Sequence, residues 1–185
     1  MSGKTTLATT LASKFEYNCI STDDIGEILQ TVIDINPMKG FDYREYYIKK
    51  SVDELNIEAW EYHKKISPAI KHLIEIHSKW GMPIIIEGWA LYPSFLENIT
   101  NKNIRKIWLI GDLDVLRRRL INETAFYQGA SNEKLMISKY LQRSMWHNEK
   151  IFNDVRATGE YIKITNDLTK DDLLKTSIQI LDKSF

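Results

Sequence analysis

The stretch M-S-G-K-T-T-L-A-T-T-L-A, residues 1–12, decides the fold of this chain. Residues 2–6 (S-G-K-T-T) match the second half of the phosphate-binding loop pattern G-x-x-x-x-G-K-[ST]. Apolar residues then recur at helical spacing over residues 4–15, so a helix is expected to begin directly after the glycine. A helix N-terminus offers backbone N–H groups and a favourable dipole to an anion. The stretch therefore predicts a phosphate site at the start of this helix.

The residues of this loop suit a nucleotide and its metal ion. The candidate nucleotide contacts are Ser2, Gly3, Lys4, Thr5 and Thr6. The Lys4 ammonium would face the β- and γ-phosphates, and Thr5 would offer a hydroxyl ligand to Mg²⁺. Five residues can also match this pattern by chance, so the prediction depends on the residues in the rest of the chain.

The composition indicates one domain without a strong charge. The chain has 185 residues, 43% of them hydrophobic, which is enough for one buried core. Lys and Arg together number 25, as do Asp and Glu, so no overall positive field favours nucleic acid or an anionic membrane. No apolar run approaches the roughly 20 residues of a membrane span, and the first residues do not form a leader-like pattern. The single cysteine, Cys19, fits a reducing compartment, so we expect a cytoplasmic protein. We also expect a monomer or homodimer with no nucleic-acid or membrane partner.

Short apolar strands alternate with longer helical segments along the chain. The strands are predicted at residues 17–21, 83–87, 105–110 and 160–165. Helices are predicted after residue 23, across 42–80, after Asp112, across 132–158 and across 170–181. This alternation implies an α/β fold in which helices cover both faces of a parallel sheet.

Several helix boundaries can be assigned to particular residues. Ser67-Pro68 is expected to divide the segment 42–80 into two helices, because serine caps well and proline is tolerated in a first turn. Asp23 or Asp24 is expected to cap the helix that follows the first strand. Asp112 is expected to cap a helix whose core stripe is Leu113, Leu116 and Leu120.

Two of the predicted strands end in a carboxylate. Asp23 follows the first strand, and Glu87 ends the apolar run of residues 84–86. In a parallel sheet, functional groups gather beyond the carboxyl ends of the strands. Glu87 also has the position of the acid that supports Mg²⁺ in nucleotide sites. Asp23 could instead be only a helix cap, and Glu87 only a strand end exposed to water.

Three segments together resemble one protein family. Residues 2–8 (S-G-K-T-T-L-A), 21–25 (S-T-D-D-I) and 84–89 (I-I-I-E-G-W) with Pro93 resemble the P-loop small-molecule kinases, especially the group of 2-phosphoglycerate kinase and zeta-toxin-like kinases. The resemblance implies a three-layer α/β/α fold with a parallel sheet of order 2-3-1-4-5. It implies a single domain over residues 1–185, with a helical cap over the acceptor at 26–80 and a lid at 116–143.

The first strand of the resembled fold has no counterpart in this sequence. That strand precedes the phosphate loop and lies at the centre of the sheet. The four remaining strands would have to close over a gap or split, leaving buried backbone groups unpaired at roughly 1–3 kcal/mol each. We therefore expect the working protein to begin upstream with an apolar strand, and Met1 to be an internal methionine of the loop.

The resemblance also assigns roles to side chains outside the loop. Asp23 would orient the acceptor hydroxyl or take its proton, and Glu87 would support Mg²⁺ through water. Arg119, followed by Leu120, is similar to the arginine that reaches the nucleotide, and Arg143 is the best remaining lid cation. Arg117 and Arg118 are expected to be solvated.

The expected cap carries further candidates for the acceptor site. Arg44, Lys49 and Lys50 could face an acidic or phosphorylated acceptor, although a solvated helix face explains them equally well. Its aromatic residues could line an acceptor pocket, although packing is favoured for them; they are Tyr43, Tyr46, Tyr47 and Trp60.

The expected function is transfer of a phosphoryl group from ATP, with Mg²⁺, to a hydroxyl of a small molecule. An acidic or phosphorylated metabolite such as 2-phosphoglycerate is one such acceptor. The alternatives are a nucleotide, antibiotic or nucleotide-sugar kinase on the same fold, and a non-catalytic nucleotide-binding module. The expected catalytic residues are Lys4, Asp23, Arg119 and Arg143, and the expected metal ligands are Thr5 and Glu87.

Overall fold

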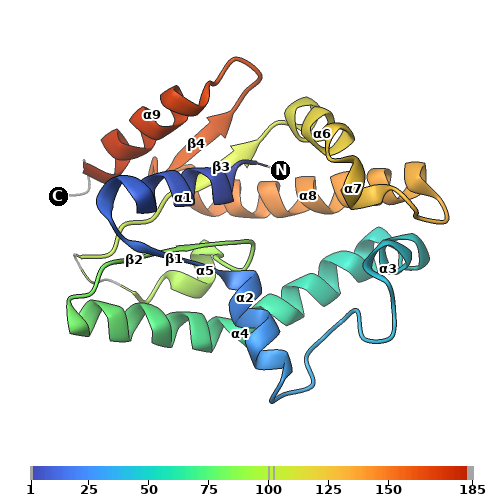
Figure 1. Cartoon of the computed structure of the whole chain (residues 1–185), viewed down its shortest axis with the longest axis horizontal. Helices are drawn as coiled ribbons and strands as arrows, with labels where there is room; N and C mark the ends of the chain where they lie inside the picture. Colours follow the sequence, from blue (N-terminus) through green and yellow to red (C-terminus); the bar gives the residue numbers. More distant parts are fainter. Residues whose placement is uncertain (1, 100, 102, 183–185) are drawn as a thin grey trace.

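The computed structural model describes residues 2–99, 101 and 103–182 as a mixed α/β chain with two small parallel sheets (Figure 1). The helices are α1 (Lys4–Phe15), α2 (Thr22–Gln30), α3 (Tyr43–Lys49), α4 (Val52–Trp80), α5 (Pro93–Leu96), α6 (Leu113–Asn122), α7 (Thr124–Tyr127), α8 (Glu133–Val155) and α9 (Lys170–Asp182). The strands are β1 (Asn18–Ser21), β2 (Ile84–Glu87), β3 (Trp108–Gly111) and β4 (Tyr161–Ile164).

The strands pair in parallel, as predicted, but they form two sheets and not one. β1 pairs with β2 from Asn18↔Ile84 to Ser21↔Glu87, and β3 pairs with β4 from Trp108↔Tyr161 to Gly111↔Ile164. Among the described residues no strand pairing joins the two sheets. The α/β class is therefore confirmed, and a continuous three-layer sheet is absent from the described part of the chain because β2 and β3 do not meet. Splitting was one of the two outcomes expected for four strands without a central one.

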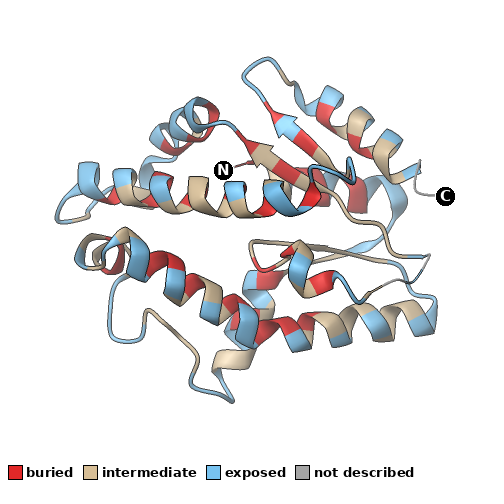
Figure 2. Cartoon of the chain, turned by 180° about the vertical axis from the view of Figure 1, so that it is seen from behind, coloured by how far each residue is buried: buried red, intermediate tan, exposed pale blue. Residues whose placement is uncertain are grey.

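Helices hold the two sheets in one molecule. α1 packs against β1, β2 and α9, so it extends from one sheet toward the other (Figure 1). α8 packs against β3 and against α3, α4, α5 and α6. Figure 2 shows buried residues along the inner sides of α4 and α8. One cluster joins α1 to the second sheet through Leu7, Leu11, Leu109 and Ile162. Within the described ranges, no helix has both the length and the apolar character needed to cross a membrane.

The predicted division of residues 42–80 is wrong in position. α4 continues without a break through Pro68, and the boundary lies at Ser51, which forms a capping box with Glu54. Proline cannot donate to the carbonyl four residues earlier, which is that of Lys64. The Ser67 hydroxyl donates to this carbonyl at 3.1 Å. The helix therefore tolerates Pro68 because a neighbouring side chain supplies the missing donor.

Two predicted caps also need correction. Ser21, and neither Asp23 nor Asp24, caps α2, because its hydroxyl accepts a hydrogen bond from the Asp23 backbone N–H at 3.1 Å. Asp112 lies at the N-cap position of α6, but its side chain makes no capping hydrogen bond. The first residue of the predicted α6 core stripe, Leu113, is 37% exposed, whereas Val115 is buried instead. Leu116 and Leu120 are buried as predicted, so the stripe is confirmed at two of its three positions, and Val115 takes the place of Leu113.

Candidate functional site

The loop before α1 has the backbone that its sequence predicts. Gly3 is the N-cap residue and has a φ of 92°, a left-handed conformation that favours glycine. A Cβ at Gly3 would lie 3.5 Å from Nη1 of Arg119. Ser2 is buried, and its hydroxyl accepts a hydrogen bond from Lys4 Nζ at 3.4 Å. The structure thus places the Arg119 guanidinium of α6 next to this loop.

Thr5 meets Glu87 directly. The Thr5 hydroxyl donates to Oε1 of Glu87 at 3.1 Å, although the residues are 82 positions apart. Thr5 lies in the first turn of α1, and Glu87 is the last residue of β2, against which α1 packs. Two oxygen ligands of the kind that Mg²⁺ prefers therefore lie side by side at the end of a strand.

Lys4 lies between two carboxylates and an aromatic ring. Burial lowers the pKa of its ammonium, and the nearby Glu87 and Asp23 carboxylates act in the opposite direction. The ammonium also lies 5.0 Å from the centre of the Trp89 ring, within cation–π range. Glu87 and Trp89 are separated only by Gly88, so the end of β2 supplies both a carboxylate and the ring beside the lysine.

Asp23 faces the same place from the start of α2. Loss of solvent around its carboxyl raises the pKa, although the residue as a whole is exposed, and the positive charges of Lys4 and Arg143 lower it. Because Ser21 caps the helix, the Asp23 carboxylate is not needed for that task. The alternative in which Asp23 serves only as a cap is therefore contradicted.

Arg143 reaches the site from α8. Its guanidinium lies 5.4 Å from the centre of the Trp89 ring and 5.6 Å from that of Tyr47, and it donates a hydrogen bond to the Tyr47 hydroxyl. Trp89 therefore contacts both predicted cations, Lys4 and Arg143. Trp89 belongs to the run of residues 84–89 that the sequence singled out, but an aromatic residue there is equally typical of a core position.

Gly88 allows β2 to end close to α2. Its φ is 145°, and a Cβ at this position would lie only 1.8 Å from the hydroxyl oxygen of Thr22, which is fully buried. Any side chain at residue 88 would push the two elements apart. Glu87 directly precedes Gly88, and Asp23 directly follows Thr22. The close contact of Gly88 with Thr22 therefore holds Glu87 and Asp23 near each other.

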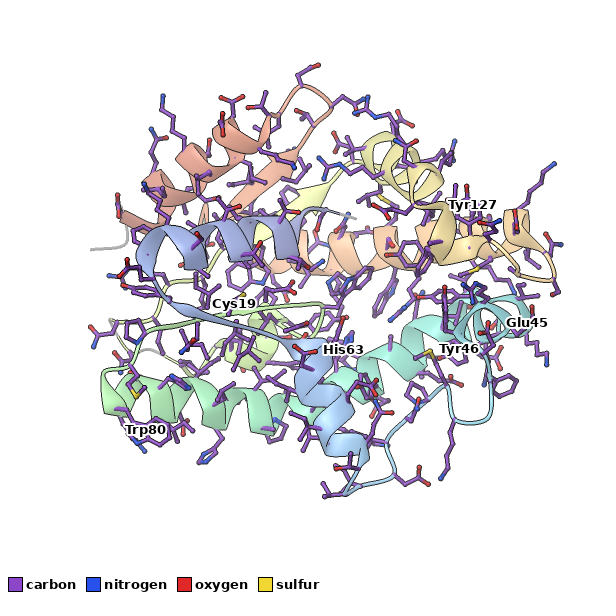
Figure 3. The ribbon with its side chains drawn as sticks, viewed as in Figure 1. Cys19, Glu45, Tyr46, His63, Trp80 and Tyr127 are labelled. Carbon is purple, nitrogen blue, oxygen red and sulfur yellow. The ribbon has the colours of Figure 1, made fainter. Side chains whose placement is uncertain are left out.

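The three candidate acceptor-site cations of the expected cap contact other residues of the protein. Lys49 lies 5.1 Å from the centre of the Phe41 ring. Arg44 donates to the carbonyl of Ala125 at 3.0 Å and pairs with Asp42, while Lys50 pairs with Glu58 at 2.5 Å. Glu45 and Tyr46 of α3 are labelled in Figure 3. Glu45 accepts two hydrogen bonds from Ser131, whereas Tyr46 donates to Glu58 of α4. The contacts of Arg44 and Glu45 join residues of the expected cap to residues of the expected lid.

Arg117 and Arg118 are exposed, as predicted. Thr6 is exposed in the first turn of α1, beside Thr5.

Buried His63 and half-buried His147 both pack against the Tyr92 ring. Nδ1 of His147 is 2.8 Å from the Tyr92 hydroxyl, and the His147 ring is 4.7 Å from that of Trp89. His63 of α4, labelled in Figure 3, contacts the Tyr92 ring at 5.6 Å, and its Nδ1 has no partner among the described residues. Burial lowers the pKa of His63 to about 3 and that of His147 well below its ordinary value. Both rings are therefore neutral at pH 7.

The free energy of unfolding is expected to fall as the pH decreases below about 6.5. A histidine whose pKa is lowered in the folded protein binds a proton more readily in the unfolded chain. Its contribution to the free energy of unfolding is therefore complete above the unfolded pKa of about 6.5 and is lost as the pH falls toward the folded pKa of about 3. The slope is about 1.4 kcal/mol per pH unit for each such histidine. Urea unfolding between pH 4 and 8 would measure it. His63→Phe should flatten the curve, whereas His72→Phe, at an exposed position on the same helix, should not. Equal slopes in the two variants would contradict the assignment.

A metal ion would have few ligands from the protein here. Among the described residues no group of three or more His, Cys, Asp or Glu side chains could hold a metal ion. Thr5 and Glu87 nevertheless fit Mg²⁺, which usually takes one or two protein oxygens and completes its shell with water and phosphate oxygens. The donor set suits a metal that arrives with a phosphorylated ligand.

Comparison with models of protein families gave no match, and neither did comparison with curated proteins.

Proposed function

We propose that this chain transfers the γ-phosphoryl group of ATP to a hydroxyl group of a small molecule, on a site of the P-loop kinase type. The observation that carries the proposal is the contact between Thr5 and Glu87 beside Lys4, with Asp23 facing the same point. These four side chains come from α1, α2 and the end of β2, and their types match the needs of phosphoryl transfer: a cation, a metal-binding pair and a proton acceptor.

The residues would divide the reaction between binding and proton transfer. The loop N–H groups and Lys4 would bind the β- and γ-phosphates, and Arg119 and Arg143 would balance the charge that spreads over the transferred group. The acceptor oxygen would form a bond to the γ-phosphorus while the bond from that phosphorus to the β,γ-bridging oxygen breaks, releasing ADP. Asp23 would receive the proton of the acceptor hydroxyl. Mg²⁺, held by Thr5 and Glu87, would neutralise phosphate charge.

The arrangement of elements supports the same fold type and an anionic acceptor. In the order 2-3-1-4-5, strand 2 pairs with strand 3, and strand 4 pairs with strand 5. The observed pairs β1–β2 and β3–β4 of this chain would correspond to these two pairs. The cap would be residues 26–80 and the lid residues 116–143. Arg143 donates to the hydroxyl of Tyr47, and its charge acts on Asp23, so an acidic or phosphorylated acceptor would find a cation there.

An acceptor screen scored by ADP release tests the proposal. The panel should contain phosphorylated hydroxy acids, nucleosides, hydroxylated antibiotics and nucleotide sugars, each with ATP and Mg²⁺. Turnover with one class, lost in Asp23→Asn, would support a kinase. ATP binding without turnover across the panel would instead indicate a nucleotide-binding module.

Loss of either metal ligand is expected to change the Mg²⁺ requirement. Glu87→Gln and Thr5→Ala should each raise the Mg²⁺ concentration for half-maximal ATP turnover about 10-fold, equivalent to roughly 1.4 kcal/mol. Titration of Mg²⁺ at fixed ATP would measure the shift. Glu97→Gln and Thr10→Ala, at exposed positions away from the site, are the matched controls. An unchanged requirement in Glu87→Gln would leave Glu87 as an ordinary strand end.

A further inference from the structure

Lys4 and Arg143 share one aromatic neighbour, Trp89. The Lys4 ammonium lies 5.0 Å from the centre of the Trp89 ring, and the Arg143 guanidinium lies 5.4 Å from it. Lys4 begins α1, Arg143 belongs to α8 and Trp89 follows β2, so three separate elements meet at this ring. The face of an indole ring attracts cations, most strongly where water is excluded. The ring therefore attracts two cations that come from different helices.

Neither cation forms an ion pair in the described part of the chain. The ion pairs found there do not include Lys4 or Arg143. Lys4 has a long hydrogen bond to Ser2, at 3.4 Å, and Arg143 donates to the Tyr47 hydroxyl. A charged side chain that has lost water needs a stabilising neighbour. Trp89 is a neighbour of this kind for both cations at once.

The Trp89 ring is held by residues that are not part of the charged cluster. The centre of the His147 ring lies 4.7 Å from that of Trp89, and the Tyr140 ring lies 6.2 Å away. His147 is held in turn by the hydroxyl of Tyr92, 2.8 Å from its Nδ1, and Tyr92 is fully buried. These contacts fix the orientation of the Trp89 ring before any ligand binds.

A fixed ring can order flexible side chains in advance of binding. Lysine and arginine side chains lose rotamer freedom when they are held in one place. A site in which they are already ordered loses less of that freedom when a ligand binds. We propose that Trp89 is a positioning residue, whose ring holds Lys4 and Arg143 at the site before a ligand binds. Its consequence for ATP rests on the proposed function, whereas the order of the two cations in the free protein does not.

A purely apolar role for Trp89 is the alternative, since its ring also packs against the core cluster that contains Tyr140. Packing needs apolar volume, whereas positioning needs an aromatic face. Trp89→Leu removes the ring and keeps an apolar side chain, and Trp89→Phe keeps a smaller ring. Trp89→Met is a second variant without a ring, with a flexible side chain that fills irregular space. Phe152→Leu is the matched control, because it removes a ring that lies 5.3 Å from the Lys163 ammonium, outside the site.

The first measurement uses the full chain without ATP. NMR relaxation of the side-chain nitrogens of Lys4 and Arg143 reports how far each cation is ordered. The order parameters should fall in both variants without a ring and should stay near the wild-type values in Trp89→Phe and Phe152→Leu. Urea unfolding of every variant identifies those that are folded, and Trp89→Met replaces Trp89→Leu if the latter is not.

The second measurement is calorimetric titration with ATP and Mg²⁺. Trp89→Leu should bind ATP about 10-fold more weakly, because binding would then have to order two long side chains. Trp89→Phe should stay within about 3-fold of wild type, because its ring still attracts cations, although less than an indole does. Phe152→Leu should bind like wild type.

Three results would overturn the inference. Unchanged order parameters of both cations in the variants without a ring would mean that Trp89 does not hold them. An equal fall in Trp89→Phe and Trp89→Leu would assign the effect to lost packing. Wild-type affinity for ATP in Trp89→Leu would mean that the ring does not prepare the site for binding. If wild type binds no ATP while the order parameters change as expected, the proposed function fails and the positioning of the two cations by Trp89 stands.

Discussion

Lys4→Ala is expected to weaken ATP binding by about 10- to 100-fold. Hydrogen bonds to charged groups contribute roughly 1.5–3 kcal/mol, and Lys4 would make such bonds to two phosphates. In the structure its ammonium lies at the centre of the site, with the Glu87 and Asp23 carboxylates and the Trp89 ring as neighbours. Removing it would leave two carboxylates without their cation, facing an incoming polyanion. The expected loss of affinity therefore has two causes: the phosphates lose the attraction of the Lys4 ammonium, and they are repelled by the Glu87 and Asp23 carboxylates.

Calorimetric titration with ATP and Mg²⁺ would measure this loss. Trp89 offers a second readout, because the lysine lies over its ring and a bound nucleotide would change its fluorescence. Lys14→Ala is the matched control, since it removes an exposed lysine from the last turn of the same helix. If wild type and Lys4→Ala bind ATP with the same affinity, residues 2–6 do not form a phosphate-binding loop, even though their sequence matches its pattern.

Local sequence patterns predicted most of the elements. The helix over 4–15 was predicted to the residue because its apolar spacing and its glycine N-cap are both local signals. The break at Ser67-Pro68 was wrong because its outcome depends on a hydrogen bond from Ser67 to Lys64, which competes with the breaking effect of proline. The boundary at Ser51 had its own local signal, a serine followed three residues later by Glu54.

The candidate site was predictable where it depends on topology and unpredictable where it depends on packing. Asp23 and Glu87 come together because parallel strands end at one edge, a rule that can be applied to sequence. Trp89 and Tyr47 contact Arg143, but aromatic residues in the core have the same sequence pattern. The engagement of Arg44 and Lys50 by other residues likewise depends on contacts that no spacing specifies.

Asp23→Asn is expected to reduce turnover by at least about 100-fold, the usual contribution of a positioned general base, while ATP affinity stays near that of wild type. Asparagine keeps the size of the side chain but cannot take the acceptor proton. Asp24→Asn is the matched control, because Asp24 is the exposed neighbour in the same first turn of α2. ATP titrations on both variants would separate binding from turnover.

The pH dependence of turnover gives an independent test of the same residue. Loss of solvent raises the pKa of the Asp23 carboxyl above its ordinary value, against the opposing charges of Lys4 and Arg143. The group must be ionised to accept a proton, so turnover should fall as the pH decreases through this raised pKa, at a higher pH than for a solvated aspartate. Asp23→Asn should lose that acidic limb together with most of the rate, and Asp24→Asn should keep both. Near-normal turnover in Asp23→Asn with the acidic limb intact would assign the proton transfer to another group and leave Asp23 as a first-turn residue of α2.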